Sequence, residues 1–77
     1  MSKEMGNHLR FIRKSRTDYT QTDVAKLLFL NRVTYTKYEL GDSEPSIETI
    51  KRLCEIFDVD VAELLYYERN EYIKTNQ

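Results

Sequence analysis

Apolar residues recur at intervals of three and four positions along most of the chain, and this spacing predicts amphipathic α-helices. The pattern and its breaks indicate five helices, over about 5–16, 21–28, 32–40, 47–57 and 61–74. Residues 1–6 are expected to form a loose arm or the frayed start of the first helix. Two Gly and one Pro are too few for a turn-rich β fold, so we predict an all-α fold.

The apolar faces of these helices predict which side chains form the core. On the first helix, Leu9 and Ile12 share one stripe. Tyr35 and Tyr38 lie three residues apart, and we expect their rings to pack inward while their hydroxyl tips stay exposed. The fourth helix is expected to bury an apolar stripe that consists of Ile47, Ile50, Leu53, Cys54 and Phe57.

Polar residues and a glycine indicate where the helices begin and end. Thr20, followed three residues later by Asp23, resembles a capping box. Gly41 is expected to end the third helix, because glycine adopts the left-handed conformation at little cost. The two short helices between these points would not be stable alone, so they must pack on others. Together they predict a helix-turn-helix, with further N-caps at Asn31, Ser46 and Asp60.

The same region carries the pattern TQ-x-x-VA-x-x-L-x-LNR-x-TY-x-KYE-x-G, followed by EPSIETI-x-x-L. This pattern resembles the Cro/CI-type (XRE) helix-turn-helix family over roughly 9–65. The resemblance implies one domain over 1–77 with a five-helix, lambda-repressor-like fold and the helix-turn-helix at about 21–40. It also implies that Glu39 pairs with an arginine of the first helix, for which Arg13 is the expected partner.

Two residues depart from the family pattern. Phe29 stands where relatives often have glycine, so either its backbone is strained or the turn differs slightly. Asp42 stands where many relatives place Lys or Asn after the glycine, and an acid there would repel the DNA backbone. This second departure lowers the affinity that we expect for DNA without removing the geometry.

In a helix-turn-helix, the start of the second helix of the motif reaches base edges in the major groove. The expected base contacts are the outward residues Arg32, Val33, Thr36 and Lys37, and Arg32 has the geometry for a bidentate bond to guanine. The expected phosphate contacts are Gln21, Asn31, Thr34, Tyr38 and Leu40, and the resemblance implies those of Gln21 and of the backbone near Leu40. An ordinary solvated helix surface is the alternative for each of them.

Charge is distributed unevenly although the net charge is only −1. Residues 1–40 hold eight Lys or Arg against four Asp or Glu, whereas residues 41–77 hold four against nine. A basic half would attract phosphates and an acidic half would point away from them. Chance clustering on solvated helices is the alternative interpretation.

Candidate catalytic chemistry is sparse. His8 is the sole histidine and is expected at the surface, while Cys54 is the sole cysteine and is expected in the core. No His/Cys cluster has metal-ligand spacing and no glycine-rich phosphate loop is present, so we expect no enzyme activity, no cofactor and no metal. The chain also lacks an apolar run of membrane-spanning length and a secretory signal, so we expect a cytoplasmic, nucleoid-associated protein of a bacterium or phage.

The end of the fifth helix carries more aromatic residues than so small a core can bury. Adjacent residues on a helix cannot both point inward, which suggests a surface for self-association at Tyr66, Tyr67, Tyr72 and Ile73. A capping layer over the first helix is the alternative.

Together these features predict a sequence-specific DNA-binding transcriptional regulator, a small repressor that binds double-stranded DNA at a pseudo-palindromic operator as a homodimer. One alternative is the antitoxin of a toxin–antitoxin pair, which would also bind a partner protein. The other is a protein-interaction module with weak DNA binding.

Overall fold

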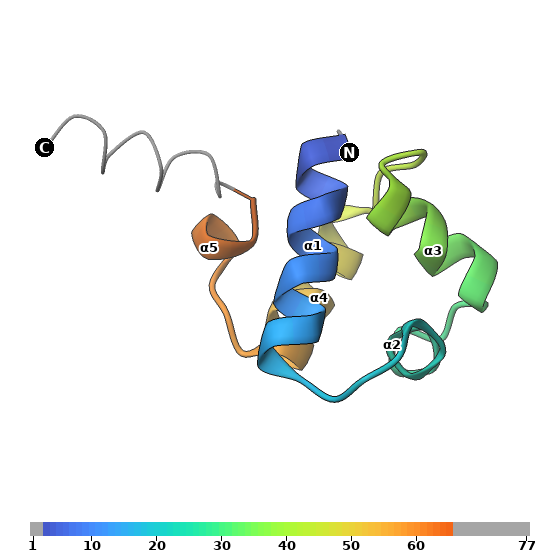
Figure 1. Ribbon diagram of the computed structural model, residues 1–77, viewed down its shortest axis with the longest axis horizontal. Helices are drawn as coiled ribbons and strands as arrows, with labels where there is room; N and C mark the ends of the chain where they lie inside the picture. Colours follow the sequence, from blue (N-terminus) through green and yellow to red (C-terminus); the bar gives the residue numbers. More distant parts are fainter. Residues whose placement is uncertain (1–2, 66–77) are drawn as a thin grey trace, which may run out of the picture.

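The computed structural model describes residues 3–65, which fold into helices without strands and so confirm the predicted all-α fold (Figure 1). The helices are α1 (Lys3–Arg16), α2 (Gln21–Leu27), α3 (Arg32–Leu40), α4 (Ile47–Phe57) and α5 (Val61–Leu65). The predicted continuation of the fifth helix to residue 74 lies outside the described residues.

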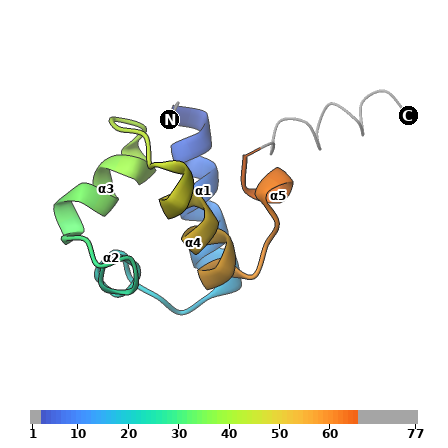
Figure 2. The ribbon, with the colours of Figure 1, turned by 180° about the vertical axis from the view of Figure 1, so that it is seen from behind.

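Helix α1 is central to the arrangement. It packs against α3, α4 and α5, while α2 packs mainly on α3. Figure 1 shows α3 on one side of α1 and α5 on the other, and the reverse view in Figure 2 shows α4 lying along α1. All five helices contribute to one core, whose buried apolar residues are Leu9, Ile12, Val24, Ala25, Leu28, Tyr35, Tyr38, Leu53, Phe57, Val59 and Leu64.

The start of the chain differs from the sequence prediction. Helix α1 begins at Lys3, so a loose start is the wrong description for residues 3–6. Gly6 is buried against the end of α3, where an added Cβ would lie 2.5 Å from the carbonyl oxygen of Glu39. The absence of a side chain therefore lets the two backbones touch, and this contact holds the first turn in place.

The predicted caps of the helices are confirmed. The side chains of Thr20, Asn31 and Ser46 each accept a hydrogen bond from the backbone three residues on, and Thr20 with Asp23 forms a full capping box. Gly41 ends α3 in the left-handed conformation, with φ 79°. Asp60 Oδ1 accepts the backbone N–H of Glu63 at 2.7 Å. Local sequence signals therefore define the boundaries of the short helices.

The apolar stripe of α4 is narrower than predicted. Leu53 and Phe57 are buried, Ile50 and Cys54 are half-buried, and Ile47 is 73% exposed. At about 100° per residue, Cys54 and Ile47 lie roughly 80° and 100° from the direction shared by Leu53 and Phe57. The prediction of a buried Ile47 is therefore wrong, because this residue lies well around the helix from the face that packs against the core.

Candidate nucleic-acid interface

The scaffold under α3 contains the predicted ion pair between Arg13 and Glu39. Arg13 Nε lies 2.7 Å from Glu39 Oε2, and Arg13 Nη2 donates to Oε1 at 3.2 Å. Both residues are buried, with 7% and 2% of their surface exposed. The two-bond geometry therefore fixes the orientation of α3 relative to α1.

Glu39 also accepts hydrogen bonds from the Tyr35 hydroxyl and from Gln21 Nε2, the latter at 2.9 Å. Burial alone would raise the pKa of Glu39, but the hydrogen bonds from Arg13, Tyr35 and Gln21 outweigh burial and lower it. The hydrogen bond to Glu39 raises the pKa of Arg13, and burial followed by the bond to Glu39 raises the pKa of Tyr35. The carboxylate is therefore held in its charged form.

The expectation of an exposed hydroxyl tip on Tyr35 is wrong. Tyr35 is fully buried, because Glu39 on the next turn provides a buried acceptor for its hydroxyl. Tyr38 is buried as well, with 7% of its surface exposed, and its ring meets that of Tyr35 edge-on at 6.2 Å between centroids. The two rings form the inner face of α3.

Gln21 connects α2 to the outward face of α3. Its Nε2 donates to Glu39, while its Oε1 accepts a hydrogen bond from Thr36 Oγ1 at 3.1 Å. Both Gln21 and Thr36 are half-buried. A residue expected to contact phosphate is thus bonded to a residue expected to contact a base.

The remaining expected base contacts lie together on the exposed face of α3. Arg32, Val33 and Lys37 are all exposed, Val33 by 64%. In both views α3 lies at the edge of the molecule, beside α2 and far from α5 (Figure 1, Figure 2). The face therefore combines two cations with an apolar side chain on a rigid support.

The other expected phosphate contacts differ in exposure. Asn31 is exposed, and its Oδ1 accepts the backbone N–H of Thr34, which is half-buried. Leu40 is 54% exposed. The amides of Gly41 and Asp42 both donate to carbonyl groups of α3, so they are already bonded. The phosphate contacts of these residues, and that of Tyr38, stay predictions.

The turn between α2 and α3 has the strained conformation that the sequence offered as one alternative. Phe29 has φ 60°, in the left-handed region that residues other than glycine rarely adopt. Its ring is 82% exposed, and the guanidinium carbon of Arg52 lies 5.8 Å from the ring centroid.

Internal pairing reduces the positive charge that the first half presents to a ligand. Arg13 is buried against Glu39, and Arg16 of α1 forms an exposed ion pair with Glu63 of α5. In the helix-turn-helix, Lys26, Arg32 and Lys37 are exposed. The positive charge available to a phosphate backbone therefore includes both ends of the exposed α3 face and the last turn of α2.

His8 and Cys54, the two residues with the most reactive side-chain types, are both half-buried against neighbouring residues. His8 is half-buried rather than at the surface, with Nε2 2.9 Å from the carbonyl oxygen of Glu63 and its ring stacked on Phe11. Cys54 is half-buried, and burial, followed by the charges of Asp60 and Glu55, raises the pKa of its thiol. Between residues 3 and 65 there is no group of three or more potential metal ligands.

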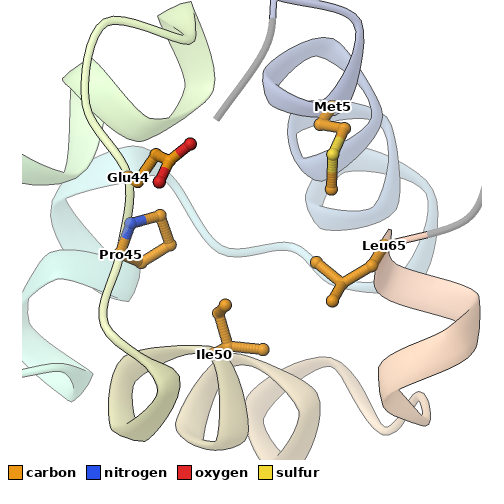
Figure 3. A pocket seen from close by; sticks show the side chains of 5 residues that line it. All are labelled: Met5, Glu44, Pro45, Ile50 and Leu65. Carbon is orange, nitrogen blue, oxygen red and sulfur yellow. The ribbon is translucent and has the colours of Figure 1, made fainter.

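A small hollow lies away from the exposed α3 face, between the start of α1, the loop before α4, and the end of α5 (Figure 3). It has a volume of about 180 Å³ and is lined by Met5, Glu44, Pro45, Ile50 and Leu65. This hollow is therefore smaller than a typical small-molecule site, which encloses about 300–1,000 Å³.

The described helices are all too short, or too polar, to cross a bilayer.

Three of the contacts around α3 that the sequence interpretation missed are the Gly6 packing, the Tyr35 hydroxyl bond and the link from Gln21 to Thr36. One of them has a recognisable signal. Tyr35 and Glu39 are four residues apart, which places them on one face of a helix. The other two join distant segments, and no local pattern indicates them.

The short helices α2 and α3, their tight turn and the exposed face of α3 define a helix-turn-helix domain. A family model described as helix-turn-helix matches residues 9–64. The chain therefore belongs to the Cro/CI-type (XRE) helix-turn-helix family, as its sequence pattern predicted.

Individual relatives are regulators by name. The chain is 41% identical over 54 residues to the HTH-type transcriptional regulator YqaE of Bacillus subtilis. It is 35% identical over 57 residues to the cryptic phage CTXphi transcriptional repressor RstR of Vibrio cholerae. These matches cover 70% and 74% of this chain but 47% and 50% of the relatives, so the chain spans about half of their length.

Two further relatives match over most of their length. The HTH-type transcriptional regulator MJ0272 of Methanocaldococcus jannaschii is 31% identical over 67 residues, which is 87% of this chain and 100% of the relative. The crystal structure of the restriction-modification controller protein C.AhdI from Aeromonas hydrophila aligns with a TM-score of 0.72 and 27% identity. That alignment covers 80% of this chain and 88% of C.AhdI.

Proposed function

We propose that this protein is a sequence-specific DNA-binding transcriptional regulator that inserts the start of α3 into the major groove. The observation that carries the proposal is the exposed face of Arg32, Val33 and Lys37, supported from behind by the buried Arg13–Glu39 pair. A rigid, cationic helix start at the edge of the molecule is what base reading requires.

Each residue of this face has a distinct role in the proposal. Arg32 donates two hydrogen bonds to O6 and N7 of a guanine, and Val33 contacts a thymine methyl. Lys37 reaches a guanine or a phosphate one turn further along. Gln21, Asn31, Thr34 and the end of α3 at Tyr38 and Leu40 lie against the phosphate backbone and fix the register.

The regulator acts as a homodimer in this proposal. Two copies of α3 then enter successive major grooves about 34 Å apart on a pseudo-palindromic operator, and occupation of promoter DNA represses transcription. Tyr66, Tyr67, Tyr72 and Ile73, which were predicted as the dimer surface, lie outside the described residues. Regulators named among the relatives support the class of function, and RstR supports repression.

The proposal is tested by selecting bound duplexes from a random DNA library and titrating the best one at several salt concentrations. We expect a selected site with two related halves. We also expect the logarithm of the binding constant to fall with the logarithm of salt by about 0.9 per phosphate neutralised. A flat salt response without site selection would favour the protein-interaction module, and co-purification of a second gene product with the chain would favour the antitoxin.

A further inference from the structure

Thr36 occupies the middle of the exposed face of α3. At about 100° per residue, it lies between Arg32 and Val33 around the helix, on the side away from the buried Tyr38. Its hydroxyl donates to Gln21 Oε1 at 3.1 Å. A threonine hydroxyl has one hydrogen to donate and two lone pairs to accept with, so in this bond the donor is used and the lone pairs remain.

The direction of that bond is fixed by Gln21. The Nε2 of Gln21 donates to Glu39 Oε1 at 2.9 Å. An ionised carboxylate only accepts hydrogen bonds, so a reversed Gln21 amide would turn its oxygen toward the carboxylate oxygen and repel it. Gln21 therefore presents Oε1, an acceptor, to Thr36.

The Glu39 carboxylate is held in place for Gln21, because Arg13 donates to both of its oxygens and Tyr35 donates to Oε2. Each hydrogen bond in this series therefore has one direction only, with the outer group as donor and the inner group as acceptor. The series starts at the buried carboxylate, passes through the Gln21 amide and ends at the Thr36 hydroxyl.

We infer that Thr36 is a specificity-determining residue that accepts a hydrogen bond from adenine or cytosine and rejects guanine at the base it faces, with Gln21 as the positioning residue. This inference rests on the proposed function. Adenine N6 and cytosine N4 are the amino donors of the major groove, whereas guanine presents O6 and N7, both acceptors. The lone pairs of Thr36 match the former and repel the latter.

The test compares binding-site selections for the wild type and for Thr36→Val, which keeps the shape but removes the acceptor. The wild type should show one position per half-site at which adenine or cytosine is preferred over guanine. Thr36→Val should reduce that preference by about five-fold, the equivalent of one hydrogen bond, and leave the other positions unchanged.

A second variant tests the positioning role. Gln21→Leu removes the acceptor that holds the Thr36 hydroxyl hydrogen, so the hydroxyl can turn and donate. We expect this variant to accept guanine at the Thr36 position, while its binding to every sequence weakens through the loss of the phosphate contact. The selection reads base preference rather than affinity, so the two effects separate.

The outcomes also separate this inference from the proposed function. If the wild type selects no site, the proposed function fails. If it selects a site but Thr36→Val changes no position, or the position it changes is guanine in the wild type, the inference fails and the proposed function stands. If Gln21→Leu still rejects guanine at the Thr36 position as strongly as the wild type does, the positioning role of Gln21 is overturned.

Discussion

Arg13 and Glu39 join α1 to α3 inside the protein, with Nε 2.7 Å from Oε2 and both side chains buried. Glu39 belongs to α3, the helix that carries the expected base contacts, and the pair lies on the buried side of that helix. It acts chiefly on orientation, because the cost of removing two charges from water offsets much of their attraction.

Removing one member of this pair should therefore be worse than removing both. Arg13→Met leaves the Glu39 charge buried without its ionic partner, and we expect a loss of about 3–5 kcal/mol in the free energy of unfolding. The double variant Arg13→Met/Glu39→Leu should be more stable than Arg13→Met alone. Urea unfolding followed by circular dichroism measures both, and losses that simply add would contradict this account of the pair.

The lowered pKa of Glu39 predicts a specific pH dependence. The folded pKa lies below the ordinary value of 4.5, so the unfolded chain binds more protons in that range. The stabilisation is therefore present above pH 4.5 and is lost as pH falls through the folded pKa.

Tyr35→Phe tests this assignment, since it removes one donor from the carboxylate and moves the folded pKa of Glu39 back up. We expect the variant to lose less stability than the wild type between about pH 5 and pH 2. Urea midpoints measured across that range give the comparison. An equal or larger loss in the variant would show that Tyr35 does not lower the pKa of Glu39.

Phe29 predicts a difference between two small substitutions. Phe29→Ala and Phe29→Gly both remove the exposed ring and its contact with Arg52, but only alanine keeps a Cβ at φ 60°. We expect the glycine variant to be more stable than the alanine variant by about 1 kcal/mol, as measured by thermal or urea unfolding. An alanine variant that equals or exceeds the glycine variant would mean that the turn relaxes and carries no strain.

Gly6 predicts the same order for a different reason, since glycine is needed there for space and not for a left-handed backbone. Alanine is the better helix former by about 1 kcal/mol, but a Cβ at Gly6 meets backbone atoms of α3. Because backbone cannot step aside as a flexible side chain can, we expect Gly6→Ala to lower the free energy of unfolding by about 1–3 kcal/mol. Asn7→Ala, at an exposed neighbouring position, is the control and should be neutral or slightly stabilising. A stabilising Gly6→Ala would show that α1 and α3 do not approach this closely.

Local signals account for most of what the sequence could predict. Caps such as Thr20 and Asn31 act within one turn, so their residue types suffice to place the helix ends. The Arg13–Glu39 pair was accessible only through family resemblance, since the two residues are 26 positions apart. The burial of Gly6 and the bond between Gln21 and Thr36 depend on how whole helices dock, and a pattern along the chain does not encode that docking.

The error at Ile47 has a related cause. An apolar residue on an apolar stripe was assigned to the core, but the stripe is wider than the surface that α1 and α5 can cover. Burial on a helix is decided by the neighbour as well as by the helix, so the margins of a stripe are its least predictable positions.

The central claim is that the exposed face of α3 reads DNA, and anisotropy titration of Arg32→Ala tests it most directly. The duplex selected by the wild type and a scrambled duplex of the same length are each titrated with the wild type, Arg32→Ala and Lys51→Ala. Lys51 is an exposed lysine of α4 and controls for the loss of one positive charge. We predict that Arg32→Ala weakens binding to the selected duplex by about 1–3 kcal/mol and hardly changes binding to the scrambled one, while Lys51→Ala leaves the preference intact. Equal losses for both variants on both duplexes, or no binding by the wild type even at low salt, would contradict the claim.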